Sequence, residues 1–313
     1  MECNTRRRGY ITVAENSKSG DYLKMAYALA LSLKATGQDY PYLTVCVPEG
    51  TEVPEKYAAV FDNVVEMYGM DRSFHTEWKV LNKWKVYNLS PYEETVLLDA
   101  DMIFPPGGQN IGYWWDSMCE FDIRPCMVPR TYRNEHIVVS EYRKKFLSND
   151  LPSLYTAFLY FKKNERNKEY FDLIRDVTDF WSRMKYHLDN RQYPIEAIRE
   201  FGEEYVWYHF MPDLPERLSG DVAFSVASKL MGLKFSQFSV SPTFVHMRSG
   251  CQNFEDPTRI VCEDWTKFLH VGFTPYHLAI QNQRQLWPFH YHIKSFMDDE
   301  KIEILEKMYE SVL

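Results

Sequence analysis

Asp99 and Asp101 stand two residues apart near the end of an apolar run, Thr95–Phe104. In an extended segment residues i and i+2 point to the same side, so both carboxylates can reach one hard cation. Ala100 between them is small enough to let a ligand approach. A cation held here would bind the phosphates of a nucleotide. The alternative is a buried strand ending in an acidic turn, because so short a pattern recurs by chance.

The segments that lead to this acidic pair predict an α/β fold. Apolar positions between Trp78 and Leu89 recur at helical spacing, and Ser90–Tyr92 breaks that helix. Nearer the N-terminus, a strand at 10–14, a helix over 22–35 and a strand at 42–47 form a βαβ unit. Such a unit predicts a parallel sheet with nucleotide bound beyond the carboxyl ends of its strands.

Phosphates in this protein need a cation, because the usual phosphate-binding loops are missing. The loop after the first strand lacks both G-x-G-x-x-G and the P-loop signature. A metal on Asp99 and Asp101 supplies that cation, and Lys79, Lys83 or Arg248 could add positive charge near a diphosphate.

Asp221 precedes a second helical pattern, which ends near Gly232. Its plain role is a helix cap. Such a cap at the carboxyl edge of the sheet would also face the cleft.

The order helix, Pro-Tyr turn, buried strand and D-x-D resembles the metal-dependent glycosyltransferases of the GT-A fold, in particular the glycogenin-like branch. The resemblance implies a Rossmann-like, mixed and mostly parallel sheet flanked by helices over residues 1–250. Residues 251–313 would form an aromatic-rich C-terminal lid. The expected donor is a nucleoside diphosphate sugar, most simply a UDP-sugar, bound with Mn²⁺ or Mg²⁺.

In the resembled family the loop after the first strand grips the nucleoside, and a late histidine completes the metal site. The implied nucleoside residues are Thr12, Ala14, Asn16 and Tyr22, whose alternative role is to cap the following helix. Pro242, His246 and Gly250 match the spacing P-x-x-x-H-x-x-x-G, so the expected metal ligands are Asp99, Asp101 and His246. Asp221 corresponds to the acid that faces the acceptor and the reacting sugar.

Two parts of the family pattern are missing. The usual N-x-G is absent near Ser153 and Thr156, the candidates to line the donor sugar. The lysine, proline and tryptophan that follow the family's histidine are also absent. The resemblance implies a reaction that retains the anomeric configuration. The sequence itself leaves this open, since an inverting enzyme needs a general base and Asp221 could serve as one.

The net charge of −8 argues against a protein that coats nucleic acid over its whole surface. A local basic stretch, Arg124–Lys145, is nevertheless expected to bind a polyanionic acceptor. Short chains of this kind resemble glycosyltransferases of T-even-like bacteriophages, which add glucose or arabinose to hydroxymethylcytosine in DNA. That resemblance implies a hydroxymethylated DNA acceptor, reached by base extrusion.

No apolar run is long enough to span a bilayer, and the six cysteines form no C-x-x-C pair. We expect a cytoplasmic enzyme, in the host cytoplasm if it is phage-encoded, with no membrane partner. His290 and His292 could bind zinc together with His270 or His277, although packing is the plainer role. A nucleotidyltransferase acting on a sugar phosphate and a non-catalytic nucleotide-binding protein stay open as alternatives.

Overall fold

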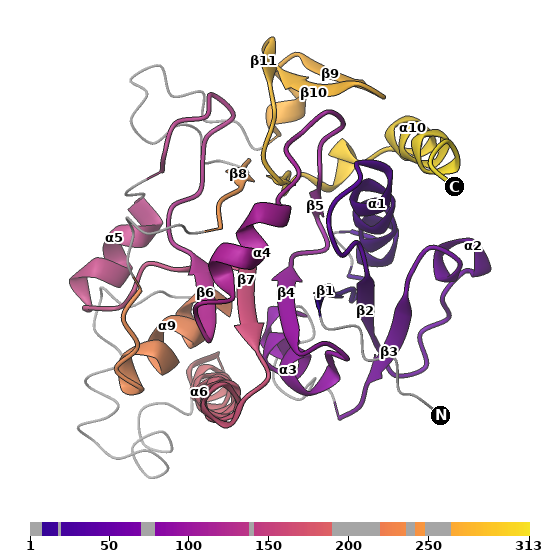
Figure 1. Ribbon diagram of the computed structural model, residues 1–313. Coiled ribbons are helices and arrows are strands. Elements are labelled where there is room, and N and C mark those ends of the chain that lie inside the picture. Colours follow the sequence, from indigo (N-terminus) through magenta and orange to yellow (C-terminus); the bar gives the residue numbers. More distant parts are fainter. Residues whose placement is uncertain are drawn as a thin grey trace.

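A six-stranded sheet forms the centre of the protein (Figure 1). The computed structural model describes residues 8–17, 20–69, 79–137, 141–189, 220–235, 242–247 and 264–313, apart from the side chains of 79–81, 141–142, 145 and 181–189. The strand order is β3-β2-β1-β4-β7-β6. The strands are β1 (Arg8–Val13), β2 (Leu43–Pro48), β3 (Asn63–Met67), β4 (Glu94–Leu98), β6 (Ile123–Cys126) and β7 (Tyr155–Lys162).

The sheet is mostly parallel. β3, β2, β1 and β4 pair in parallel, whereas β7 runs antiparallel to both β4 and β6. This arrangement confirms the predicted α/β class with a mixed, mostly parallel sheet flanked by helices. The carboxyl ends of β1, β2 and β4 meet at one edge, and Asp99 follows β4 at that edge.

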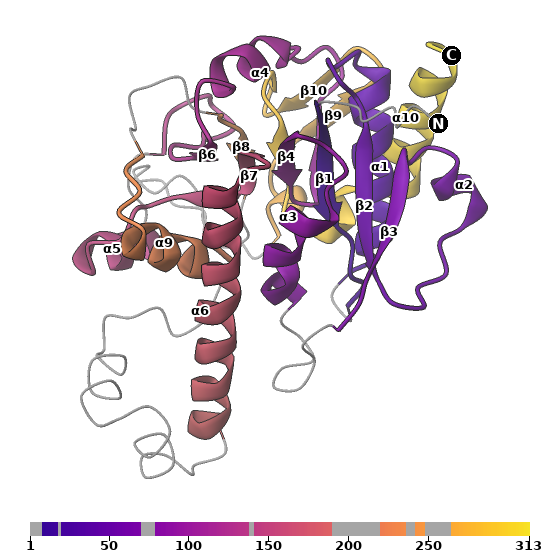
Figure 2. The ribbon, with the colours of Figure 1, turned by 60° about the horizontal axis from the view of Figure 1, so that its bottom comes forward.

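Neighbouring residues of the central strands enter two different hydrophobic clusters. Tyr10 and Val96 belong to one cluster, Ile11 and Leu97 to the other, because successive strand residues point to opposite faces. Helices cover both faces, as a parallel sheet requires. Residues of α1 (Tyr22–Ala35), α4 (Gly112–Met118) and α10 (Asp299–Glu310) enter the first cluster, and those of α3 (Val86–Leu89), α6 (Glu165–Asp189) and α9 (Gly220–Leu230) the second. Figure 2 shows α6 and α9 side by side.

Helix α1 begins and ends as its sequence predicts. The Asp21 side chain accepts a hydrogen bond from the Lys24 amide at 3.0 Å, and Gly37 takes a left-handed φ of +64° after the last turn. Two short helices, α2 (Glu55–Ala58) and α5 (Glu141–Ser148), lie between strands.

The expected regular helix over residues 78–89 is only partly present. Trp78 lies outside the described residues, and Lys79–Lys85 form the 3₁₀ helix η1 before α3. The tighter winding accompanies buried polar side chains that reach tertiary partners. Lys85 Nζ, for example, donates to the carbonyl oxygens of Tyr68 and Gly69 at 2.9 and 2.8 Å.

The C-terminal segment completes a three-stranded sheet that is separate from the main one. β12 (Phe289–His290) lies between β5 (Met102–Ile103) and β8 (Val245–His246), antiparallel to the first and parallel to the second. A second small sheet contains β9 (Val271–Thr274), β10 (His277–Ile280) and β11 (Gln283–Arg284); two 3₁₀ turns, η2 (Trp265–Lys267) and η3 (Lys294–Phe296), flank these strands. The domain boundary expected after residue 250 lies outside the described residues and stays a prediction.

Candidate functional site

The acidic pair lies in a turn at the carboxyl end of β4. The Asp99 amide still donates to Ala157 of β7 at 3.2 Å, and the Met102 amide then donates to the Asp99 carbonyl at 3.2 Å. The second bond closes a turn over Ala100 and Asp101. The expected extended geometry is therefore wrong, because the chain must turn here to enter β5.

The two carboxylates nevertheless converge, and their common neighbour is His290 of β12. His290 Nε2 lies 3.2 Å from Asp101 Oδ1 and 3.8 Å from Asp99 Oδ2. One ligand atom from each of these three residues falls within 4.8 Å of the others. Tertiary pairing, rather than strand alternation, thus assembles a group that could hold a metal ion.

Each carboxylate also contacts a lysine through its other oxygen. Lys83 Nζ bonds Asp99 Oδ1, and Lys294 Nζ bonds Asp101 Oδ2. Burial by itself would lower the pKa of both lysines. The negative charges of the two acids outweigh burial, so the pKa of each lysine lies above its usual value.

Asp101 is 5% exposed and has a strongly perturbed pKa. Burial alone would raise the pKa of this carboxyl, yet His290 and Lys294 hold it well below its usual range. The carboxylate is therefore ionised at neutral pH and can act as a metal ligand.

Asp221 lies inside the first turn of α9 rather than before it, and its carboxylate bonds residues outside the helix, so the expected helix-cap role is wrong. Oδ1 accepts hydrogen bonds from the Thr156 amide and hydroxyl at 2.8 and 2.7 Å, and Oδ2 lies 2.5 Å from Arg143 Nη2. Burial raises the pKa of Asp221, but Arg143 and Thr156 bring it below its ordinary value. Lys83 Nζ lies 3.4 Å from Thr156 Oγ1, so Lys83 connects this cluster to Asp99.

His246 lies beside the acidic group, in a second cluster. Its ring centroid is 5.3 Å from that of His290 and 5.0 Å from that of His292. Neither His290 nor Lys294 was expected from the sequence to contact the acidic pair. The pattern His290-x-His292-x-Lys294 was the available signal, because alternate polar residues in an aromatic segment can share one face.

The four residues expected to grip the nucleoside lie in β1, in the loop after it and at the first position of α1. Ala14 is buried, and Thr12 Oγ1 is buried with no hydrogen-bond partner within the described ranges. Asn16 Oδ1 accepts from the Leu23 amide at 2.9 Å, so Asn16 makes the helix-capping contact considered as its alternative role. The Tyr22 ring centroid lies 4.7 Å from Lys294 Nζ, which places Tyr22 beside the acidic site.

The other expected donor-site residues differ in what the structure describes. Lys83 contacts Asp99, and Ala100 is buried at 3% exposure. The side chain of Lys79 and the whole of Arg248 lie outside the described part of the chain.

The basic stretch Arg124–Lys145 does not present all its charges to solvent. Arg124 and Arg143 are 3% and 2% exposed, and Arg143 pairs with Asp221. These two residues are therefore not available to contact a polyanionic acceptor, because their side chains are buried in the interior. Arg133 and Lys144 are exposed.

No protein-family model matches this chain, and no curated protein matches it. Among solved structures, the chain is similar to mouse xyloside xylosyltransferase 1 in its apo form, at 11% identity, 74% coverage of this chain, 84% of that chain and a TM-score of 0.39. It is also similar to the galactosyltransferase LgtC in complex with donor and acceptor sugar analogues, at 12% identity, 97% and 95% coverage and a TM-score of 0.39. A third similar structure is a Bacillus anthracis protein described as a glucose-1-phosphate thymidylyltransferase, at 10% identity, 54% coverage of this chain, 74% of that chain and a TM-score of 0.32. Likenesses this weak carry no argument about activity.

Within the described ranges, no helix combines the length and the apolar character needed to cross a bilayer.

Proposed function

We propose that the protein is a metal-dependent glycosyltransferase that moves a sugar from a nucleoside diphosphate sugar, most simply a UDP-sugar, to a hydroxyl acceptor. The observation that carries the proposal is the convergence of Asp99, Asp101 and His290 at the carboxyl end of β4. In open α/β sheets this edge is where ligands bind.

The ligand atoms fit a divalent ion. Each carboxylate gives one oxygen to a lysine and turns the other, Asp99 Oδ2 or Asp101 Oδ1, toward His290. Two carboxylate oxygens and an imidazole suit Mn²⁺, and the carboxylates alone suit Mg²⁺. When bound, such an ion acts as a Lewis acid on a diphosphate leaving group. Which histidine completes the site, His290 or the expected His246, is part of the proposal.

Lys83 and Lys294 set the net charge of this site. Their ammonium groups neutralise the two carboxylates, so an added divalent ion gives the site a net positive charge. A diphosphate carries negative charge and is attracted to that surplus. The same surplus stabilises the additional negative charge that develops on the leaving phosphate.

The nucleoside end of the donor is proposed to lie against Thr12, Ala14, Asn16 and Tyr22. Support comes from Tyr22, the first residue of α1, whose ring lies against Lys294. It also comes from the buried hydroxyl of Thr12, which makes no hydrogen bond within the described residues. Arg248 and Lys79 stay in the proposal as further positive charges near the phosphates.

Asp221 is proposed to orient the acceptor hydroxyl or to stabilise the cationic sugar. Both its oxygens already have partners, so it acts through its negative charge rather than as a free base. Thr156 Oγ1, which donates to Asp221, is the adjoining candidate to contact the donor sugar.

The proposed acceptor is hydroxymethylcytosine in bacteriophage DNA, with glucose or arabinose as the transferred sugar. The support on this chain is the pair of exposed cations Arg133 and Lys144. Arg124 and Arg143 are buried and do not add to the basic surface that could follow a DNA backbone.

A thermal-shift screen of nucleoside diphosphate sugars tests the donor half. The preferred donor should raise the melting temperature with Mn²⁺ or Mg²⁺ present, and the shift should disappear with a chelator or in Asp101→Ala. Asp176→Asn, an exposed acid of α6, is the matched control and should keep the shift. A full shift in the presence of chelator would overturn the metal-held diphosphate.

Incubation of that donor with plain and hydroxymethylated DNA tests the acceptor half. Mass spectrometry of the nucleosides should show the added sugar on hydroxymethylcytosine alone. Sugar transfer to neither DNA, together with a metal-dependent donor shift, would reject the DNA acceptor and retain the donor proposal.

A further inference from the structure

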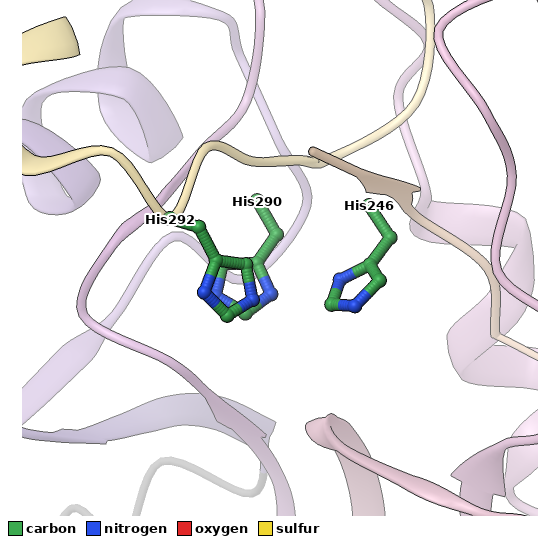
Figure 3. A group of neighbouring side chains, drawn as sticks. All are labelled: His246, His290 and His292. Carbon is green, nitrogen blue, oxygen red and sulfur yellow. The ribbon is translucent and has the colours of Figure 1, made fainter. Parts of the chain in front are cut away.

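Three histidines from two distant segments lie together next to the acidic pair. His246 of β8 is the register partner of His290 of β12, and His292 follows two residues later. The ring centroids of His290 and His292 are 4.0 Å apart with 26° between the planes. Figure 3 shows these two rings stacked, with His246 facing them from the neighbouring segment.

The backbone at His292 departs from a strand to make this arrangement. Its φ is +51°, in the left-handed region that non-glycine residues adopt uncommonly. The next amide, of Ile293, donates to the Tyr291 carbonyl at 2.5 Å and closes a tight turn around His292. Side chains at i and i+2 of a regular strand stand about 6.6 Å apart, so the turn is what brings the two rings into contact.

The central ring of the cluster is buried and incompletely satisfied. His290 is 3% exposed, and its Nδ1 makes no hydrogen bond to any described residue. A buried imidazole nitrogen without a partner is costly in an apolar setting. A bound cation would satisfy such a nitrogen.

We propose that His246, His290 and His292 form a binding site for a borderline transition metal, for which Zn²⁺ is the probe. One nitrogen from each histidine lies within 4.8 Å of the other two. Zinc bonds imidazole nitrogen at about 2.0–2.1 Å and accepts three histidines with an open fourth position. Because an imidazole binds metal in its ring plane, the stacked rings of His290 and His292 must rotate toward one point to hold the ion. Imidazoles favour zinc, copper, nickel and iron over magnesium.

The three-histidine site and the carboxylate site compete for His290. Neutral imidazole offers a single lone pair, and His290 belongs to both groups, so it can bind one ion at a time. Zinc on the three histidines withdraws His290 from Asp99 and Asp101. This competition, unlike zinc binding itself, rests on the proposed function.

Zinc titration by calorimetry tests the site without any donor or acceptor. Metal-stripped protein carrying no affinity tag should bind one Zn²⁺ per chain. Co²⁺ should bind at the same site and give the visible absorption of a low-coordinate nitrogen site. The double variant His246→Gln/His292→Gln should bind Zn²⁺ at least tenfold more weakly, since even outer-shell changes weaken metal binding by about 10–100-fold. The exposed His270 lies outside the cluster, so His270→Gln is the matched control and should bind normally.

Equal zinc affinity in the double variant and in His270→Gln would overturn the site. If the double variant melts below the range of the titration, the single variant His292→Gln replaces it, because glutamine keeps a polar side chain of similar reach.

Competition is measured through Mn²⁺ in the same proteins. Zinc should weaken Mn²⁺ binding to the wild type at least tenfold and should have little effect on the double variant. An Mn²⁺ affinity of the wild type that zinc leaves unchanged would overturn the shared use of His290. Failure to find any sugar donor would count against the proposed function and leave the zinc titration unaffected.

Discussion

Asp99 and Asp101 differ from Asp221 in how the protein uses their oxygens. Asp99 and Asp101 each give one oxygen to a lysine and direct the other toward His290. One oxygen of Asp221 accepts hydrogen bonds from both the amide and the hydroxyl of Thr156, and the other accepts one from Arg143. The first pair retains oxygens for an ion, whereas the bonds of Asp221 tie α9 to β7 and α5.

The partners explain this difference. A lysine ammonium is a compact charge that leaves the second carboxylate oxygen uncovered, whereas Arg143 adds a planar fork that also donates to the Leu154 carbonyl at 2.5 Å. Arg143 is buried, with its guanidinium carbon 3.6 Å from the Tyr155 ring centroid. An acid held in this way contributes mainly to stability, and an acid held by lysines can exchange partners.

The largest expected effect is on metal binding. Asp101→Asn should weaken Mn²⁺ binding by about a hundredfold or more, because it removes a charged ligand where even outer-shell partners contribute about 10–100-fold. Asp221→Asn should change Mn²⁺ affinity less than tenfold, since it is not in the metal group. Mn²⁺ titration followed by electron paramagnetic resonance measures both. Equal losses in the two variants would remove the distinction between the acids.

The second effect is on stability. Arg143→Met should lower the free energy of unfolding by about 3 kcal/mol, because it leaves the mostly buried Asp221 charge without its partner. Urea denaturation measures the change. Arg175→Met is the control: Arg175 pairs with Asp172 on the surface of α6, where such pairs contribute about 1 kcal/mol or less. A similar small loss in both variants would refute a structural role for the Arg143–Asp221 pair.

Acid should weaken the contribution of Asp221. Its pKa is lowered in the folded state, so its stabilising charge is fully present above the unfolded pKa of about 3.9 and is lost as pH falls through the folded value. The stability difference between the wild type and Asp221→Asn should therefore shrink below about pH 4, by at most about 1.4 kcal/mol per pH unit. Urea midpoints from pH 6 downward would show it, and a constant difference would contradict the assignment.

The smallest effect concerns one hydroxyl. Thr156→Val removes the 2.7 Å hydrogen bond to Asp221 and retains the bond from the backbone amide. We expect a loss of about 1–1.5 kcal/mol in unfolding free energy, typical of a single hydrogen bond. Ser148→Ala, in the exposed part of α5, should change stability by less than about 0.5 kcal/mol. A neutral Thr156→Val would show that the amide bond alone holds Asp221.

Much of the fold could be predicted because its information is local. Strand β1, helix α1 and strand β2 follow from apolar periodicity, from the cap Asp21 and from the glycine after the helix. The position of the acidic pair at the end of β4 follows in the same way. The turn at Ala100 does not follow from the sequence, because Thr95–Phe104 has the pattern of one continuous apolar strand. The bend is needed only because the chain enters β5 after β4 ends.

The sequence by itself determined that two carboxylates stand at the carboxyl end of a buried strand in an α/β protein. Tertiary structure decided their partners: β12 inserts between β5 and β8 and brings His290 and Lys294 to residues almost two hundred positions earlier. The reason is that strands pair through backbone N–H and C=O groups, which nearly all residues have. The pattern of side chains alone therefore does not tell which distant segment pairs with β5 and β8. In the folded chain, Lys83 pairs with Asp99, Lys294 with Asp101 and Arg143 with Asp221, because a buried carboxylate needs a neighbouring positive charge.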